Sequence, residues 1–169
     1  DRDWSSDVCS SDLSPVGPFR DFIGWLKQQD PTRAEPFWRQ HLRHFPTPTP
    51  LIADRRATGA TATVGTHTAR LAHGTQQGLQ ALARSEGLTL NTLFLAAWAI
   101  LLGRYSGEKD VLFGVVVSGR SPALPGVERI VGLLINTVPA RVRIDDARPL
   151  SAWLKELQSE HAEREQYGH

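Results

Sequence analysis

The stretch Ile130–Arg143 reads Ile-Val-Gly-Leu-Leu-Ile-Asn-Thr-Val-Pro-Ala-Arg-Val-Arg, and the rest of the chain is interpreted outward from it. An apolar run reaches the polar pair Asn136-Thr137 and then changes to an alternation of apolar or small residues with polar ones. A period of two is typical of a strand with one buried face. The pattern therefore predicts a strand over Thr137–Ile144.

Asn136 stands where the buried run meets this strand. An unsatisfied buried polar group costs about 1–3 kcal/mol, so its amide needs hydrogen-bond partners. Two interpretations stay open. Asn136 can cap or complete a turn, as Asn residues commonly do, or it can direct a polar group into a cavity.

The residues from Val131 to Val138, followed by Arg141, resemble the Ile-Gly-x-Phe-x-Asn-Thr-x-x-x-Arg signature of condensation domains from nonribosomal peptide synthetases, which make secondary metabolites. Val131 replaces Ile, and Leu134 stands where the family commonly has Phe. Similar resemblances cover Trp25-Leu26 with Phe37–Leu42, Leu90–Gly107 and Gly114–Arg120. The resemblance implies an α/β, chloramphenicol-acetyltransferase-like fold, mostly its C-terminal lobe, with a mixed sheet covered by helices.

Condensation domains join an acyl or peptidyl thioester to an aminoacyl thioester, each carried on a carrier protein. The resemblance therefore implies carrier proteins and adjacent synthetase domains as partners. It also implies a phosphopantetheine arm that belongs to the partner, with no cofactor bound covalently to this chain and no metal. Two alternatives stay open: a noncatalytic module that docks a carrier protein or an oxygenase, and an epimerisation or ester-forming domain of the same superfamily.

The family's catalytic motif is His-His-x-x-x-Asp-Gly, whose second His is thought to position or deprotonate the acceptor amine. A general base must lie within hydrogen-bond reach of the proton that it removes. None of the six histidines has a neighbouring His, and none has Asp four residues later; they are His41, His44, His67, His73, His161 and His169. No catalytic residue is assigned, and we expect the 169-residue chain alone to be inactive.

Candidate site residues follow the Val-rich run Val111–Val117, which predicts a central strand with both faces covered. Ligands prefer the loops at the carboxyl ends of strands in open sheets. Ser118 can offer a hydroxyl there, Gly119 permits close backbone approach, and Arg120 can pair with a carboxylate or with the phosphate of the arm. Equally, Gly119 can make a turn and Arg120 can anchor the loop. By resemblance only, Asn136 and Thr137 join this predicted substrate-tunnel wall.

Length, composition and net charge narrow the classes of partner and compartment to expect. The chain has 169 residues, 40% of them hydrophobic, a net charge of +1, one Cys and no Met. This charge gives no reason to expect nucleic acid or an anionic membrane as a partner. The apolar run Leu93–Leu102 is shorter than the roughly 20 residues of a membrane-spanning helix. A single Cys suits a reducing compartment, so we expect the cytoplasm.

The chain divides into three expected parts. Residues 1–12 repeat Ser-Ser-Asp, resemble translated sequencing-adapter DNA and read as a non-native scar or a disordered tail that contains Cys9. Residues 13–50 predict bridging helices and a Pro/Thr linker, and residues 51–169 predict a truncated C-terminal lobe. We therefore interpret the chain as a fragment, and expect an exposed apolar interface to make it marginally soluble.

The expected elements follow from periodicity and capping signals. Alternation predicts a strand at Thr66–Ala72. Pro36 is compatible with a helix only in its first turn. Two histidines do not make a metal site, so we discount His41 and His44 as ligands. The predicted helices cover Phe19–Gln29, Arg33–Arg43, Thr75–Ser85 capped by Thr75, the mostly buried Leu90–Tyr105 capped by Thr89, and Leu150–Gln166.

Overall fold

The structure is a computed structural model that describes residues 16–45, 48–50, 65–121 and 123–168. The predicted segment 1–12 lies outside these described residues. The elements, in chain order, are α1 (Phe19–Lys27), α2 (Pro31–His41), α3 (His73–Glu86), α4 (Leu90–Ser106), β1 (Asp110–Val117), the short 3-10 helix η3 (Val127–Arg129), β2 (Asn136–Arg143) and α5 (Leu150–Gln166).

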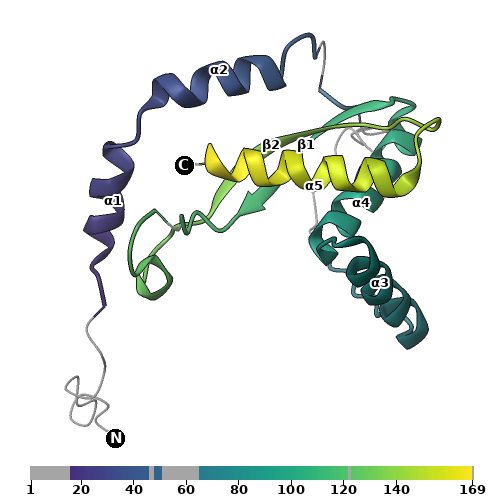
Figure 1. The fold of residues 1–169 in the computed structure, drawn as a ribbon, viewed down its shortest axis with the longest axis horizontal. Coiled ribbons are helices and arrows are strands. Elements are labelled where there is room, and N and C mark those ends of the chain that lie inside the picture. The colour runs from purple at the N-terminus through teal and green to yellow at the C-terminus, as the bar shows by residue number, and fades with distance from the viewer. Residues whose placement is uncertain (1–15, 46–47, 51–64, 122, 169) are drawn as a thin grey trace, which may run out of the picture.

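The strands β1 and β2 form an antiparallel pair that runs from Asp110 opposite Arg143 to Val117 opposite Asn136. Helices α4 and α5 pack on one face of this pair and on each other (Figure 1). Val111 and Ala140 are completely buried there. The core therefore lies between the two strands and these two helices, as expected for alternating strands with one apolar face.

A second, smaller apolar cluster fixes α1. Phe22 packs with Val127, Ile130 and Leu134, which belong to η3 and the segment before β2. Gly132 lies so close to the ring of Phe19 that a Cβ at this position would overlap it. This packing brings α1 beside the connection between β1 and β2, although α1 precedes β1 by more than 80 residues.

The helix signals of the sequence predicted α4 and α5 correctly. The Thr89 side chain accepts a hydrogen bond from the backbone N–H of Thr92 at 3.1 Å, which is the expected N-cap. Gly107 ends α4 in the left-handed conformation with φ 79°. The observed bounds of α5 coincide with the prediction.

The prediction of strands was partly wrong. Residues 65–72 form no strand, because an extended segment becomes a strand only through pairing with a neighbour. The sheet among the described residues has two antiparallel strands, where a mixed sheet was predicted. β1 is covered on one face only, since Val116 on the other face is 66% exposed.

Two helix details also differ from the prediction. The second helix spans Pro31–His41 rather than Arg33–Arg43, with Pro36 at its sixth position and not in its first turn. Pro36 lacks the N–H that would bond the carbonyl of Thr32, but Thr32 is exposed, so water can satisfy that oxygen. Thr75 lies inside α3, whose N-cap is Ala72.

Helix α4 was predicted to be buried on most sides, and this is wrong for its outer face. That face exposes five large side chains at helical spacing: Leu90, Phe94, Trp98, Leu101 and Tyr105. Contiguous exposed apolar surface of this kind favours association. No single described helix is long and apolar enough to cross a membrane; α3 and α4 meet that criterion only as a pair, which is bent by 110°.

The double variant Phe94→Glu, Trp98→Lys should be more soluble than the unmodified chain. Both side chains are about half exposed, so each change should cost about 1 kcal/mol of the free energy of unfolding, roughly half of the contribution of a fully buried side chain. Light scattering and thermal melts against the unmodified chain measure the two effects. The matched control is Leu95→Glu on the buried face of α4, which should unfold the protein.

Candidate functional site

The hairpin brings the predicted site residues to one end of the molecule. Val117, the last residue of β1, pairs with Asn136, the first residue of β2, and Val116 pairs with Thr137. Ser118, Gly119 and Arg120 follow directly from β1. All five predicted residues therefore lie at the same end of the two strands.

Gly119 has φ +63°, a conformation that only glycine adopts without strain. A Cβ at this position would overlap the carbonyl oxygen of Leu134 and lie 2.8 Å from its carbonyl carbon. Gly119 therefore both turns the chain and lets two backbone segments approach closely.

The side chain of Arg120 is bound to the loop that begins at this residue. Its Nη1 donates hydrogen bonds to the carbonyl oxygens of Val127 and, at 3.3 Å, of Ile130. The Ser118 Oγ accepts from the backbone N–H of Arg120 at 3.3 Å, which leaves the hydroxyl hydrogen for another acceptor. These contacts favour the interpretation of Arg120 as a loop anchor.

Asn136 uses its amide to hold the end of α5. Its Nδ2 donates to the carbonyl oxygen of Gly168 at 2.8 Å, and its Oδ1 accepts from the backbone N–H of Thr137 at 2.8 Å. The amide is therefore satisfied within the protein. The Cγ2 of Thr137 lies against Gly114, where a Cβ would be 2.9 Å away.

A pocket of about 390 Å³ opens at this end of the strands. Ser118, Gly119 and Arg120 line it, whereas Asn136 and Thr137 do not. Three elements close it, and the other lining residues are Trp25 and Gln29 of α1, Val117, Ser121 and Ala123, and Ala162, Glu165, Gln166 and Gly168 at the end of α5. The sequence held no signal for the residues of α1 and α5, because only tertiary packing brings them here.

At the opposite end of the strands, Arg141 forms a partly buried ion pair that the sequence did not indicate. Its Nε and Nη2 donate to the two carboxylate oxygens of Asp110 at 2.6–3.1 Å. Its Nη1 donates to the carbonyl oxygens of His41 at 3.1 Å and Arg43 at 2.7 Å. The hydrogen bonds from Arg141 hold the pKa of Asp110 below its usual value. Arg141 thereby ties the end of α2 to both strands.

His41 occupies this junction as a neutral, partly buried imidazole. Burial, together with the guanidinium groups of Arg164, Arg141 and Arg143, lowers the pKa of His41 from 6.5 to about 4. Between these values the unfolded chain binds the proton more readily than the folded one, so stability rises with pH. Acidification from pH 6.5 to pH 4 should therefore remove on the order of 2–3 kcal/mol of stability through His41.

The variant His41→Gln should lose that part of the pH dependence. Denaturant unfolding at a series of pH values between 4 and 7 measures it directly. His73→Gln, at an exposed position at the start of α3, is the matched control and should keep the dependence of the unmodified chain. Parallel curves for His41→Gln and the unmodified chain would contradict the assignment.

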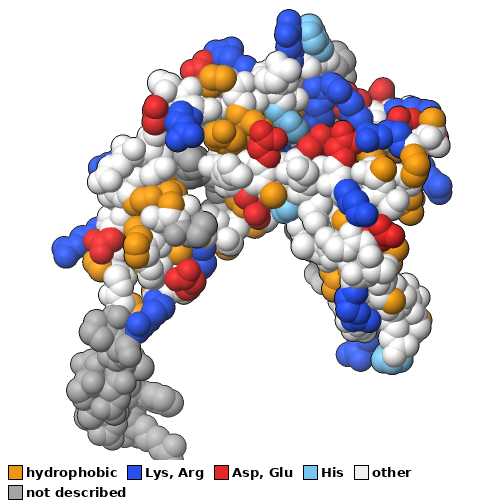
Figure 2. Space-filling model, viewed as in Figure 1, with side chains coloured by type: hydrophobic (Ala, Val, Ile, Leu, Met, Phe, Trp, Pro, Cys, Tyr) orange, Lys and Arg blue, Asp and Glu red, His pale blue; other side chains and the backbone are white. Residues whose placement is uncertain are grey.

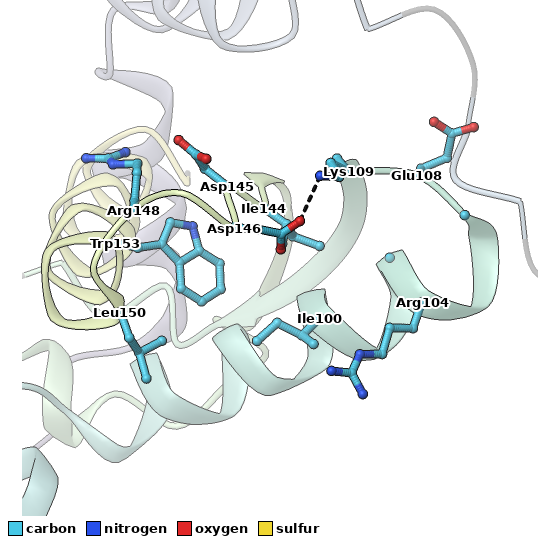
Figure 3. Close-up of a pocket in the computed structure, with 12 residues that line it drawn as sticks. Ile100, Arg104, Glu108, Lys109, Ile144, Asp145, Asp146, Arg148, Leu150 and Trp153 are labelled. Carbon is cyan, nitrogen blue, oxygen red and sulfur yellow. Dashed lines mark hydrogen bonds and ion pairs between the residues drawn. The ribbon is translucent and has the colours of Figure 1, made fainter.

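A further pocket, of about 490 Å³, lies at the turn between α4 and β1 (Figure 3). Ile100, Ile144 and Trp153 face its interior. Lys109 and Asp146 form an ion pair of 2.7 Å across one side. The indole N–H of Trp153 donates to the carbonyl oxygen of Arg143 at 2.8 Å, which fixes the ring. None of the predicted site residues lines this pocket.

The described part of the chain contains no set of ligands for a metal ion. No group of three or more His, Cys, Asp or Glu side chains is placed there to hold an ion. His41 instead stacks on Phe37, with ring centroids 5.6 Å apart. His44 has a positive φ of 58° just after α2.

Sequence comparison identifies relatives along nearly the whole chain. The family model described as "Condensation domain" matches residues 9–169. Chondramide synthase cmdD of Chondromyces crocatus is 47% identical over 150 residues, which are 89% of this chain and 4% of that protein. Bacitracin synthase 3 of Bacillus licheniformis is 34% identical over 157 residues, 92% of this chain and 2% of that protein. The chain thus spans a small part of the length of these relatives.

Solved structures share the fold. The first condensation domain of the CDA synthetase superposes with a TM-score of 0.72 at 16% identity, over 92% of this chain and 35% of that one. The X-domain from teicoplanin biosynthesis has a TM-score of 0.66 at 25% identity, over 88% of this chain and 33% of that one. The predicted α/β, chloramphenicol-acetyltransferase-like fold class is confirmed, and the chain belongs to the condensation-domain family.

Proposed function

We propose that this chain supplies part of the substrate tunnel of a condensation domain in a nonribosomal peptide synthetase. The domain joins an acyl or peptidyl thioester to the amine of an aminoacyl thioester. Each substrate is carried on the phosphopantetheine arm of a carrier protein, and the proposed setting is the cytoplasm. The observation that carries the proposal is the pocket at the end of β1, where the family-like residues Ser118, Gly119 and Arg120 meet α1 and α5.

The polar groups of this pocket suit a neutral chain that contains amides. The hydroxyl of Ser118 has a hydrogen to donate to an amide carbonyl, and the carboxylate of Glu165 accepts from an amide N–H. Gly119 lets the ligand approach the backbone. Since Arg120 already donates to two backbone carbonyls, we assign the phosphate of the arm to groups other than Arg120.

In the proposed reaction the amine nitrogen attacks the thioester carbonyl carbon. The C–N bond forms, the C–S bond breaks, and the thiol leaves with the proton that the amine gives up. A base within hydrogen-bond reach of the amine is required. The 169 residues contain no His-His-x-x-x-Asp-Gly, so in this proposal they bind and orient the arms and exclude water, while the base comes from another part of the synthetase.

Binding of pantetheine to the chain tests the pocket. Titration followed by two-dimensional NMR should shift resonances of Ser118, Gly119 and the end of α5. The variants Ser118→Ala and Glu165→Gln should each weaken binding about fivefold, the effect of about 1 kcal/mol for one hydrogen bond. Glu108→Gln, in the other pocket, is the matched control and should bind normally. Unchanged affinity in both pocket variants would refute the assignment.

An activity assay separates catalysis from docking. The 169-residue chain alone should form no amide from carrier-bound thioesters, whereas a synthetase that combines it with the His-His-x-x-x-Asp-Gly motif should do so. Amide formation by the chain alone would overturn this expectation. An inactive combination that still binds carrier protein would favour the noncatalytic docking module.

A further inference from the structure

The pocket at the end of β1 lies between two helices. It is lined from α1 by Trp25 and Gln29, and from α5 by Ala162, Glu165 and Gln166. Residues three or four positions apart lie on the same face of a helix, so one face of α1 and one face of α5 border the pocket. The loop that follows β1 also lines it. A ligand in this pocket therefore contacts two helix faces as well as the end of the strand.

Trp25 supplies an aromatic wall that packing holds in place. Its indole stacks on Phe22, with ring centroids 6.0 Å apart and an interplanar angle of 26°. Phe22 is itself buried against Ile130 and Leu134. The carbonyl oxygen of Trp25 accepts a hydrogen bond from Nε2 of Gln29 at 3.0 Å. Because the indole is already ordered, a ligand that packs against it loses little affinity to the ordering of this side chain.

Small residues leave room beside this wall. Ala123 in the loop and Ala162 on α5 both line the pocket, and both are exposed. The face of the molecule drawn in Figure 2 exposes hydrophobic side chains over α1, whereas acidic and basic side chains gather over α5. The pocket thus has an apolar side at Trp25 and a polar side at Glu165. Its volume of about 390 Å³ lies within the roughly 300–1,000 Å³ of small-ligand pockets, which suits an acyl group with the adjoining part of an arm.

We propose that Trp25 and Ala162 form a subsite for the acyl group of the thioester, and that this subsite selects a planar aromatic group. The inference rests on the proposed function, since it takes the ligand of this pocket to be an acyl thioester. A flat ring stacks on an indole in an offset arrangement, which a linear alkyl chain cannot do. The methyl group of Ala162 leaves space for that ring, and a larger side chain at this position would fill the space.

Three acylated arms test the subsite: S-acetyl-, S-hexanoyl- and S-phenylacetyl-pantetheine, each titrated into the 169-residue chain and followed by two-dimensional NMR. We expect the phenylacetyl arm to bind about three- to tenfold more tightly than the other two. Equal affinities for all three would overturn the subsite and leave the pantetheine pocket standing. A hexanoyl arm that binds as tightly as the phenylacetyl arm would refute selection of an aromatic group. If none of the three binds, the proposed function of the pocket fails together with the subsite.

Two variants locate the selection. Trp25→Leu keeps an apolar contact with Phe22 but should bring the ratio of the phenylacetyl and acetyl affinities close to one. Ala162→Leu should weaken binding of the phenylacetyl arm about fivefold or more. It should fold normally, because position 162 is exposed and Leu is a good helix former. The matched controls Trp98→Leu and Ala152→Leu, at exposed positions outside this pocket, should keep the ratio of the unmodified chain. An unchanged ratio in both pocket variants would overturn the proposal.

Discussion

Replacing Gly119 with alanine should destabilise the protein by about 2–5 kcal/mol. A non-glycine residue in the left-handed conformation costs about 1–2 kcal/mol, and forcing atoms into a packed site costs about 1–3 kcal/mol more. Both costs apply, because the new Cβ would overlap the Leu134 carbonyl at φ +63°. Denaturant unfolding of the two proteins measures the difference.

Gly126→Ala is the matched control for this change. Gly126 has a similar φ of +73°, but no atom lies within 4 Å of the position of its Cβ. It should therefore show only the conformational cost of about 1–2 kcal/mol. If both variants lose the same free energy of unfolding, the close approach of Gly119 to Leu134 does not contribute to stability.

Breaking the pair of Arg141 and Asp110 should cost about 2–4 kcal/mol, somewhat less than the roughly 3–5 kcal/mol for a fully buried pair, because the Asp110 side chain is 34% exposed. Arg141→Met leaves the Asp110 carboxylate without its closest cation and leaves two backbone carbonyls, of His41 and Arg43, without a donor. Asp110→Asn leaves a guanidinium that is only 7% exposed without its counter-ion.

A double-mutant cycle isolates this interaction. The double variant should lose less stability than the sum of the two single losses, since the partners contact each other. Arg39→Gln is the matched control. Arg39 Nε lies 2.7 Å from a carboxylate oxygen of Glu35, but both side chains are mostly exposed. This variant should cost less than about 1 kcal/mol. Additive single losses would show that Arg141 and Asp110 do not depend on each other.

The strands and helices that carry a regular pattern could be predicted from the sequence. The alternation after Asn136 placed β2 within one residue, and capping residues placed α4 closely. Residues 66–72 alternate as well, but a strand also requires a partner, which the pattern does not specify. Similarly, an apolar helix such as α4 does not reveal which of its faces lacks a covering element.

For the candidate site, the sequence predicted only residues that follow one another along the chain. The end of the Val-rich strand pointed to Ser118, Gly119 and Arg120, and the structure places them together in one pocket. Trp25 and Glu165 join them from α1 and α5 through packing between distant segments, for which a single sequence holds no signal. The commitment of Arg120 to two carbonyls is likewise a matter of loop geometry rather than of spacing.

The anchor at Arg120 bears on the order of folding. β1 and β2 pair only after the connection 118–135 closes, and closing a long loop costs entropy before any pairing repays it. Because Arg120 binds the carbonyls of Val127 and Ile130, the long connection can close as a succession of shorter loops. Strand pairing can then begin at Val117 and Asn136 and extend toward Asp110 and Arg143. A neutral side chain at position 120 should consequently slow folding more than it speeds unfolding.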